Sequence, residues 1–264
     1  MAFTKLNDVR MHWRETGRSD APAVIFANSL GTDCRLWDEI AQALCATYRV
    51  VLYDKRGHGL SENVPGPYSI KMLADDVLAL ADHLGLATFA FVGLSIGGQI
   101  AQQLAVQAPE RLSALVVCDS AAKIGNDEGW NARIDAVMSN GLASITGPVM
   151  ERWFTPKYHA EKQMELAGWI QMLLGTPNDG YAACCAALRE ADLTQAIPGI
   201  KTPTLVVCGD GDQSTPPELV QKTAALIPGA RFALIDDCGH IPPAEQPGAL
   251  LALLTRHFEE HIHA

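Results

Sequence analysis

Short apolar runs alternate with amphipathic segments along most of the chain. The apolar runs are continuous and rich in β-branched and aromatic residues, which is typical of strands that are buried on both faces. We expect such strands at residues 23–28, 49–54, 89–93, 112–118, 204–208 and 232–235. Apolar residues three or four positions apart indicate helices between them, at 36–45, 70–84 and 97–107. The alternation predicts an α/β protein with a mainly parallel sheet that is covered by helices on both faces.

The alternation stops between residues 122 and 190. Tryptophans and methionines occur there at helix-like spacing, and no convincing strand is present. Nothing that resembles a linker bounds this stretch. We therefore expect a single domain over residues 1–264, with a core formed by 1–121 and 191–264 and a helical cap insertion over 122–190.

Composition and charge narrow the range of functions. The 264 residues are 48% hydrophobic and 19% charged, which is typical of a globular protein. Twenty basic and thirty acidic residues give a formal net charge of −10. This balance argues against a nucleic-acid partner, which would need a basic face. It also provides no long-range attraction for an anionic substrate, so local cations must hold any such substrate.

The cysteines and the apolar runs indicate the cellular compartment. Seven cysteines occur without a C-x-x-C pair or a zinc-ligand spacing, so we expect reduced and mostly buried thiols. The first residues lack the features of a signal peptide, and no apolar run approaches the roughly 18–20 residues of a membrane span. We therefore expect a cytoplasmic protein with no membrane partner. The sequence is compatible with a monomer or a homo-oligomer.

A glycine-rich turn follows the predicted strand at 89–93. It reads G-L-S-I-G-G over residues 93–98 and leads into a predicted helix. In this strand-to-helix setting, the serine of a G-x-S-x-G pattern projects its hydroxyl above the edge of the sheet. The start of the helix supplies free N–H groups and the positive end of its dipole. We therefore predict that Ser95 is a nucleophile.

A serine nucleophile needs a base, and His240 is the candidate that we favour. It follows the last predicted strand in a glycine-containing turn, and sites in open α/β sheets form at the carboxyl ends of strands. His58 competes for this role because it lies in a glycine-rich turn after another strand. We expect His257, His261 and His263, in the C-terminal helix or tail, to be exposed to solvent.

The acid that orients the base should also follow a strand. The loop at 209–216 offers Asp210 and Asp212, and we favour Asp212 because it lies further into the loop. Asp210 would then serve the turn itself. Asp119, directly after the strand at 112–118, is a second competitor. The order serine, aspartate, histidine along the chain is the order expected of this catalytic architecture.

Attack by the serine creates an oxyanion, which needs backbone N–H donors. We expect one donor to be Ile96, the residue directly after the nucleophile. We expect the other to be Leu30, in the loop after the first strand, where Gly31 allows the backbone to turn inward.

Taken together, these segments resemble the α/β-hydrolase superfamily over nearly the whole chain. The matching parts are the turn around Ser95, the D-K-R-G-H-G turn at 54–59, the acid loop at 209–216 and the C-G-H loop at 238–240. The resemblance implies an α/β-hydrolase fold, with an eight-stranded, mostly parallel sheet and a helical cap.

One segment indicates a narrower family. Most members of the superfamily have His-Gly where this chain has Asn28-Ser29. The sequence F-A-N-S-L-G-T-D at 26–33, followed by Trp37, resembles the 3-oxoadipate enol-lactonase family. This resemblance implies hydrolysis of 3-oxoadipate enol-lactone in bacterial catabolism of aromatic compounds, on the protocatechuate or catechol branch. It also implies an acyl-enzyme mechanism with no metal or organic cofactor.

The implied substrate is a small anionic lactone, whose free carboxylate must be recognised. The insertion would cover the mouth of the site, and its cations are Lys123, Arg133, Arg152, Lys157, Lys162 and Arg189. Among them we favour Arg133, because an arginine fork can bind both carboxylate oxygens. Trp130 lies three residues earlier and can share its helical face, and Trp153 can form an apolar wall.

Other functions use the same fold. A carboxylesterase or a cofactor-free haloperoxidase would share the triad and differ in the charge of its pocket. A non-enzymatic ligand receptor would not need the complete set of Ser95, Asp212, His240 and the oxyanion loop. Haloalkane dehalogenase chemistry is disfavoured, because it uses an aspartate nucleophile.

Overall fold

The computed structural model describes residues 1–262. The prediction for His263 therefore lies outside the described residues. Eight strands form one sheet. The strands are β1 (Ala2–Leu6), β2 (Val9–Thr16), β3 (Ala23–Ala27), β4 (Arg49–Tyr53), β5 (Phe89–Leu94), β6 (Leu112–Cys118), β7 (Thr204–Gly209) and β8 (Arg231–Ile235). The predicted eight-stranded, mostly parallel sheet is thereby confirmed.

The order of the strands determines where a site can form. Across the sheet they run β1-β2-β4-β3-β5-β6-β7-β8. The pairs β1–β2 and β2–β4 are antiparallel, and every pair from β4 to β8 is parallel. The loops that follow β3, β5, β6, β7 and β8 therefore meet at one edge of the sheet, where sites of open α/β sheets lie.

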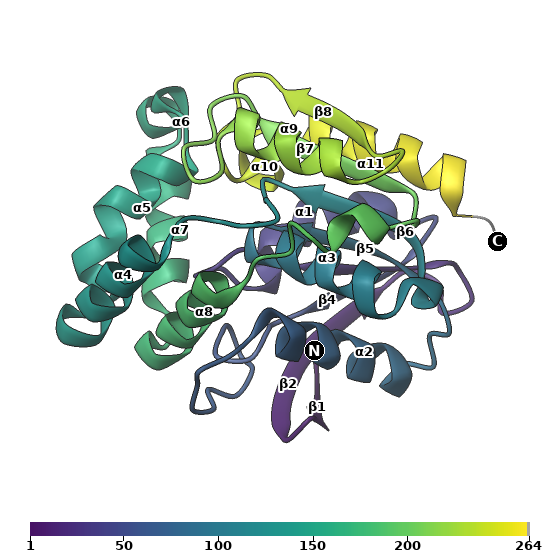
Figure 1. The fold of residues 1–264 in the computed structure, drawn as a ribbon, viewed down its shortest axis with the longest axis horizontal. Helices are drawn as coiled ribbons and strands as arrows, with labels where there is room; N and C mark the ends of the chain where they lie inside the picture. Colours follow the sequence, from purple (N-terminus) through teal and green to yellow (C-terminus); the bar gives the residue numbers. More distant parts are fainter. Residues whose placement is uncertain (263–264) are drawn as a thin grey trace.

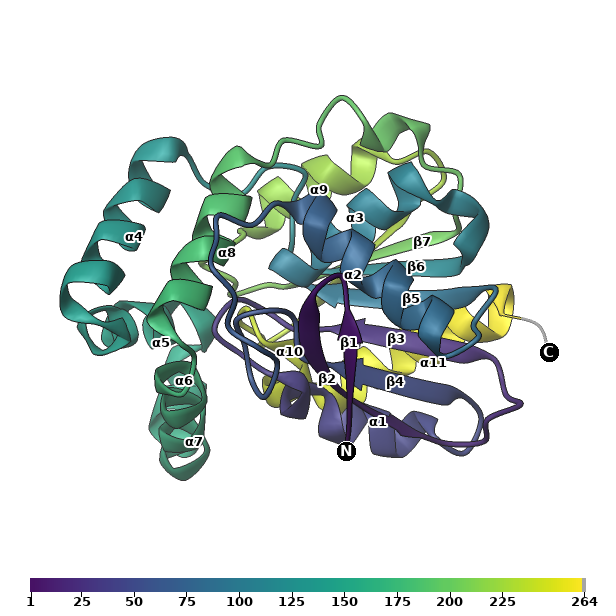
Figure 2. The same cartoon turned by 90° about the horizontal axis from the view of Figure 1, so that it is seen from below.

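Helices cover both faces of the sheet (Figures 1 and 2). The helices on one face are α2 (Ile70–His83), α3 (Ile96–Gln107) and α9 (Pro217–Leu226). Those on the other face are α1 (Asp38–Leu44), α10 (Pro242–Glu245) and α11 (Pro247–His261). Because both faces are covered, all residues of β3 and β5 are buried, as their unbroken apolar sequences predict.

Five further helices lie between β6 and β7, and form a separate group beside the sheet (Figures 1 and 2). They are α4 (Asp127–Asn140), α5 (Thr146–Trp153), α6 (Pro156–Glu161), α7 (Gln163–Leu174) and α8 (Asn178–Glu190). Short 3-10 turns occur at Cys34–Trp37, Pro109–Arg111, Leu142–Ile145 and Ile197–Gly199. We refer to residues 122–190 as the helical insertion.

The turn between β5 and α3 is held by close backbone packing. Ser95 has φ +60° and ψ −116°, a backbone conformation that residues other than glycine rarely adopt. A Cβ atom on Gly93 would lie 1.9 Å from the carbonyl oxygen of Gly97. A Cβ atom on Gly97 would lie 2.4 Å from the carbonyl oxygen of Ala27 in β3. Only glycine permits these approaches, so the G-x-S-x-G sequence is required by the turn itself.

One prediction about the histidines is wrong. His257 is 1% exposed rather than solvated, because it lies on the inner face of α11, beside Phe258. Burial lowers its pKa to about 4, so the ring is neutral at pH 7, and its Nδ1 accepts a hydrogen bond from the Arg231 guanidinium at 3.1 Å. His261, on the same helix, is about one-third exposed. The helical periodicity of α11 places residues 254, 257 and 258 on one side, and this pattern could have revealed the burial.

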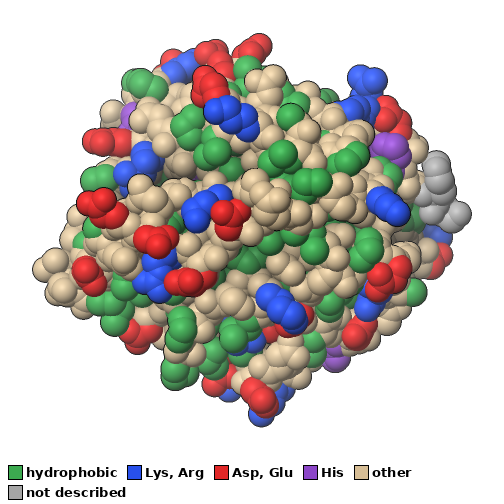
Figure 3. Space-filling view, in the orientation of Figure 1, with side chains coloured by type: hydrophobic (Ala, Val, Ile, Leu, Met, Phe, Trp, Pro, Cys, Tyr) green, Lys and Arg blue, Asp and Glu red, His purple; other side chains and the backbone are tan. Residues whose placement is uncertain are grey.

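Charged side chains of both signs are distributed over the face shown in Figure 3. Basic side chains are scattered there among acidic ones instead of forming a basic patch. Within residues 1–262, no helix is both long enough and apolar enough to cross a membrane.

The packing at Gly93 predicts a large loss of stability on substitution. We expect Gly93→Ala to lower the free energy of unfolding by about 3 kcal/mol, because the new methyl group collides with backbone that cannot move away. Urea denaturation would measure this change. The matched control is Gly168→Ala in α7, where a Cβ atom meets nothing within 4 Å. This control should raise stability by about 0.5–1 kcal/mol through helix propensity. Equal effects at the two positions would contradict the packing argument.

Candidate active site

Ser95 stands at the apex of the turn between β5 and α3, and it lines a cavity of about 240 Å³. Ser95 is 8% exposed, so its hydroxyl is reached through that cavity. The N-terminal end of α3 lies directly behind it, where unpaired N–H groups and the helix dipole favour negative charge.

His240 lines the same cavity and is held from both sides. Its Nδ1 atom lies 2.8 Å from Oδ2 of Asp212, and both residues are buried. Its backbone N–H donates to the carbonyl of Trp153, at the end of α5, at 2.8 Å. Because Nδ1 is engaged by the carboxylate, Nε2 is the ring atom left to face the cavity in which Ser95 lies.

Asp212 accepts hydrogen bonds with both of its oxygens. Oδ1 accepts from the backbone N–H of Ser214 at 2.7 Å and of Thr215 at 3.0 Å, and Oδ2 accepts from the Thr215 hydroxyl at 2.7 Å. Burial alone would raise the pKa of this carboxyl, but the charge of His240 and these hydrogen bonds lower it. Asp212 is therefore ionised and directed at the imidazole.

The two competing aspartates have other partners. Asp210 accepts from the backbone N–H of Cys238 at 3.0 Å, which joins the acid loop to the histidine loop. Asp119 accepts from the backbone N–H of Gly209 at 2.9 Å and is completely buried. Of the three carboxylates, Asp212 is the one whose oxygen is hydrogen-bonded to His240.

His58, the competing base, supports the loop after β3 instead. Its Nε2 accepts from the backbone N–H of Gly31 at 3.0 Å. Burial, reinforced by the nearby charge of Lys55, keeps the pKa of His58 well below its usual value. The ring is therefore neutral, as an acceptor must be.

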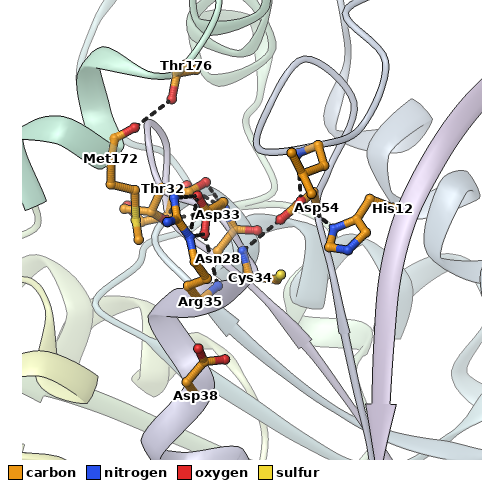
Figure 4. Close-up of polar contacts among 12 residues, drawn as sticks. His12, Asn28, Thr32, Asp33, Cys34, Arg35, Asp38, Asp54, Met172 and Thr176 are labelled. Carbon is orange, nitrogen blue, oxygen red and sulfur yellow. Dashed lines mark hydrogen bonds and ion pairs between the residues drawn. The ribbon is translucent and has the colours of Figure 1, made fainter. Parts of the chain in front are cut away.

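Further polar contacts fix the same loop (Figure 4). The Lys55 ammonium donates to the carbonyl of Ser29 at 2.6 Å, and burial lowers its pKa to about 8. The Thr32 hydroxyl donates to the same carbonyl at 3.0 Å. The Asn28 amide donates to the carbonyl of Thr32. Asn28 and Ser29 are the residues that depart from the His-Gly of the wider superfamily, and here they hold the loop together.

The two expected oxyanion donors are adjacent to the nucleophile. Leu30 lines the cavity together with Ser95, and Ile96 is the first residue of α3. Within residues 1–262, neither backbone N–H donates to a protein acceptor, whereas that of Gly31 is used by His58. The free N–H groups leave room for an anionic oxygen beside Ser95.

Two clusters contain residue types that could ligate a metal ion. One comprises His12, Cys34 and Asp54, and the other Asp119, Cys208 and Asp212. In the first, Asp54 already accepts from the N–H groups of Cys34 and Leu60 and bonds to His12 (Figure 4). In the second, Asp212 accepts the four bonds described above. Both carboxylates are committed to holding loops, so we assign neither cluster as a metal site.

The helical insertion forms the outer wall of the cavity. Trp130 and Arg133 come from α4, Arg152 and Trp153 from α5, and Tyr181 from α8. Arg133 lies over the Trp130 ring at 5.1 Å, and the indole N–H donates to the carbonyl of Ile124 at 2.6 Å. The structure therefore brings all three predicted insertion residues to the cavity that Ser95 and His240 line.

The charges of the insertion divide into two groups. Four of its six cations form ion pairs with carboxylates, namely Lys123, Lys157, Lys162 and Arg189. Within residues 1–262, Arg133 and Arg152 form no such pair, and both face the cavity. Burial and the neighbouring charge of Arg133 lower the pKa of Arg152. The cavity is therefore lined by two guanidinium groups without an acidic partner among the described residues, an arrangement that favours an anion.

Several residues at the site were not selected from the sequence. Thr215 and Ser214 follow Asp212 directly, and an aspartate that precedes serine and threonine is a signal for this kind of turn. Tyr181 had no such signal, because only tertiary packing brings α8 to the cavity. Burial raises the pKa of its phenol, and the nearby charges of Arg133 and Arg152 oppose this effect.

Comparison with known proteins agrees with this geometry. The alpha/beta hydrolase fold family matches residues 22–247. The chain is 37% identical to 3-oxoadipate enol-lactonase 2 of Acinetobacter baylyi over 242 residues, which cover 92% of this chain and 90% of that protein. It is also 37% identical to 3-oxoadipate enol-lactonase 1 of the same organism, over 90% of this chain and 89% of that one.

A solved structure shows the same likeness in three dimensions. The crystal structure of the enol-lactonase from Burkholderia xenovorans LB400 aligns with a TM-score of 0.96 and 35% sequence identity, over 98% of this chain and 100% of that one. Sequence and fold thus lead to one conclusion: the chain belongs to the α/β-hydrolase fold family and is a hydrolase.

Proposed function

We propose that the protein hydrolyses 3-oxoadipate enol-lactone to 3-oxoadipate, with Ser95, His240 and Asp212 as its catalytic triad. The observation that carries this proposal is the pair Arg133 and Arg152, which face the same cavity as the serine and have no acidic partner within residues 1–262. The substrate combines a lactone carbonyl for the serine with a carboxylate for the arginines. The similarity to two enol-lactonases of Acinetobacter baylyi supports this choice of substrate.

The first half of the reaction opens the ring. His240 accepts the proton of Ser95 as the hydroxyl oxygen attacks the lactone carbonyl. The N–H groups of Leu30 and Ile96 stabilise the resulting oxyanion. When the intermediate collapses, the bond from the carbonyl carbon to the ring oxygen breaks, and the enol oxygen takes the proton from His240. The enol tautomerises to a ketone, which makes the ring opening hard to reverse.

The second half releases the product. His240 is neutral again and removes a proton from a water molecule, which attacks the ester of Ser95. Collapse of the second oxyanion restores the serine hydroxyl and yields a second carboxylate. Asp212 holds the imidazole in the tautomer that both halves need, because its Oδ2 accepts a hydrogen bond from the Nδ1–H group. The proposed step belongs to bacterial catabolism of aromatic compounds in the cytoplasm.

The insertion supplies positive charge for an anionic substrate, which the net charge of the protein does not provide. A net charge of −10 repels an anionic lactone at long range, so binding depends on contacts inside the cavity. Arg133 is held by its contact with Trp130, which reduces the entropy lost when it binds a carboxylate. Trp153 and Tyr181 provide an apolar wall for the ring.

An assay of the purified protein on 3-oxoadipate enol-lactone beside a neutral ester of similar size tests the substrate. We expect a kcat/KM for the lactone that is at least about 100-fold higher, which corresponds to about 2.7 kcal/mol of added transition-state binding. A preference for the neutral ester would instead support a carboxylesterase, and no turnover of either would support a ligand receptor.

The triad predicts the effect of removing the nucleophile. We expect Ser95→Ala to lower kcat by about 100,000-fold, because no other group can form the acyl-enzyme. Circular dichroism should show an unchanged fold, and calorimetric titration should show that 3-oxoadipate still binds. Retention of activity in a variant that folds and binds normally would contradict the assignment of the triad.

The arginine pair predicts a selective loss of affinity for anions. We expect Arg133→Met and Arg152→Met each to raise KM for the enol-lactone by about 30-fold, the equivalent of one hydrogen bond to a charged group. Turnover of a neutral ester should change by less than about threefold, since its reaction does not use the lost charge.

The matched control for this experiment is Arg189→Met, also in the insertion. Arg189 pairs with Glu190 and does not line the cavity, so its loss should leave both activities unchanged. If all three variants weakened lactone and ester hydrolysis equally, the carboxylate-binding role of Arg133 and Arg152 would be wrong.

A further inference from the structure

Asp119 is a buried carboxyl group beside the triad that the mechanism above does not use. It follows β6 with φ +46°, a conformation that is uncommon for aspartate, and is completely buried. Its backbone N–H donates to the carbonyl of Val207 at 2.8 Å, and Oδ1 accepts from the N–H of Gly209 at 2.9 Å. The side chain is therefore fixed between the ends of β6 and β7, next to the acid loop.

The second oxygen of Asp119 has no donor. Within residues 1–262, Oδ2 makes no hydrogen bond, although a buried acceptor normally has a partner. Oxygens of Asp119 and Asp212 and the sulfur of Cys208 lie within 4.8 Å of one another. If both carboxyls were ionised, two acceptors would face each other across this distance, with no proton between them.

The groups around the pair do not neutralise a second negative charge. Cys208, Cys118 and Cys238 are neutral thiols, because burial raises their pKa values. The Nδ1 atom of His240 is hydrogen-bonded to Oδ2 of Asp212. Among the described residues, no lysine or arginine forms a hydrogen bond or ion pair with Asp119 or Asp212.

We propose that Asp119 is protonated at neutral pH and donates a hydrogen bond through Oδ2 to the Asp212 carboxylate. Asp119 is then a positioning residue for the acid of the triad. The inference rests on the proposed function, since it takes Asp212 as that acid. Two buried carboxyl groups at this separation share one negative charge, because placing two there costs far more than keeping one proton.

The proton belongs on Asp119 rather than on Asp212. Burial and the charge of Asp212 raise the pKa of Asp119 well above its usual value. The hydrogen bond from Gly209 opposes this shift but does not cancel it. Asp212 has the opposite surroundings, because His240 and Thr215 stabilise its ionised form. The single charge therefore faces the imidazole.

The donated proton completes the support of Asp212. Donors from Ser214, Thr215 and His240 already surround its two oxygens. A hydrogen bond from Asp119 adds a donor from the end of β6, outside the acid and histidine loops, and thereby resists rotation of the carboxylate away from the imidazole. Ionisation of Asp119 at high pH replaces this attraction with repulsion, so the alignment of the triad depends on the proton.

Two substitutions distinguish a protonated Asp119 from an ionised Asp119. The Asp119→Asn side chain has the shape of a neutral carboxylic acid and can donate through its amide, so kcat on the enol-lactone should stay within about threefold of wild type. Asp119→Leu has similar volume and no donor, and should lower kcat by about tenfold while KM changes little. Equally low kcat values in the two variants would overturn the proposal, as would an unchanged kcat in both.

A second measurement does not depend on catalysis. The pKa of Asp119 is higher in the folded protein than the value of about 4 in the unfolded chain. The folded protein thus holds a proton that the unfolded chain releases, and wild type loses stability as the pH rises above about 4. Asp119→Asn lacks this loss. The Tm of Asp119→Asn minus the Tm of wild type should therefore increase between pH 5 and pH 8. A Tm difference that stays constant with pH would overturn the proposal, even if the leucine variant does not fold.

Infrared difference spectroscopy provides direct evidence of the proton. Wild type at pH 7 should show the carbonyl band of a buried carboxylic acid, and this band should be absent from Asp119→Asn. A band of equal strength in both proteins would place the proton elsewhere. If the lactone assay fails while the infrared and Tm results hold, the carboxyl pair stands and only the substrate is wrong. If the lactone is turned over but the spectra are identical, the pair is wrong and the function stands.

Discussion

The close backbone packing behind Ser95 is the constraint on which the rest of the structure depends. Gly97 approaches the carbonyl of Ala27, the last residue of β3, so closely that no side chain fits between them. Ala27 leads directly into the loop that carries Leu30. The same contact that shapes the serine turn therefore fixes the distance from the nucleophile to the oxyanion loop. The parallel arrangement of β3, β5, β7 and β8 then brings the acid and histidine loops to the same edge.

Buried charge is matched locally almost everywhere in this protein. Lys55 binds backbone carbonyls, Asp54 binds backbone N–H groups, and Arg56 pairs with Asp76 at 2.6 Å. Each of these contacts holds a loop next to the candidate site. Arg133 and Arg152, which are half-buried at the cavity, depart from this pattern, because neither has an acidic partner within residues 1–262.

The core of the fold could be predicted from the sequence, and much of the site could not. Unbroken apolar strands and the glycines around Ser95 have a local cause, so pattern alone located β3, β5 and the turn. The choice between Asp210, Asp212 and Asp119 depends on distances between loops that are far apart in sequence. Arg152 was indistinguishable from the other cations of the insertion until the structure showed which of them have partners. The polarity of His257 favours an exposed position, whereas its place on the inner face of α11 buries it.

The hydrogen bond from the backbone N–H of His240 to the carbonyl of Trp153 links the insertion to the loop that carries His240. Glu245, just after that loop, also accepts from the backbone and hydroxyl of Thr155 at 3.0 and 2.7 Å. The insertion is thus not an interchangeable module. Exchanging it for one from another hydrolase would change specificity only if the graft kept the backbone path of residues 153–155; otherwise the new pocket would arrive with a displaced base. New substrate specificities in this scaffold should therefore evolve or be engineered most easily through substitutions on α4 and α8, which have no such bond to His240.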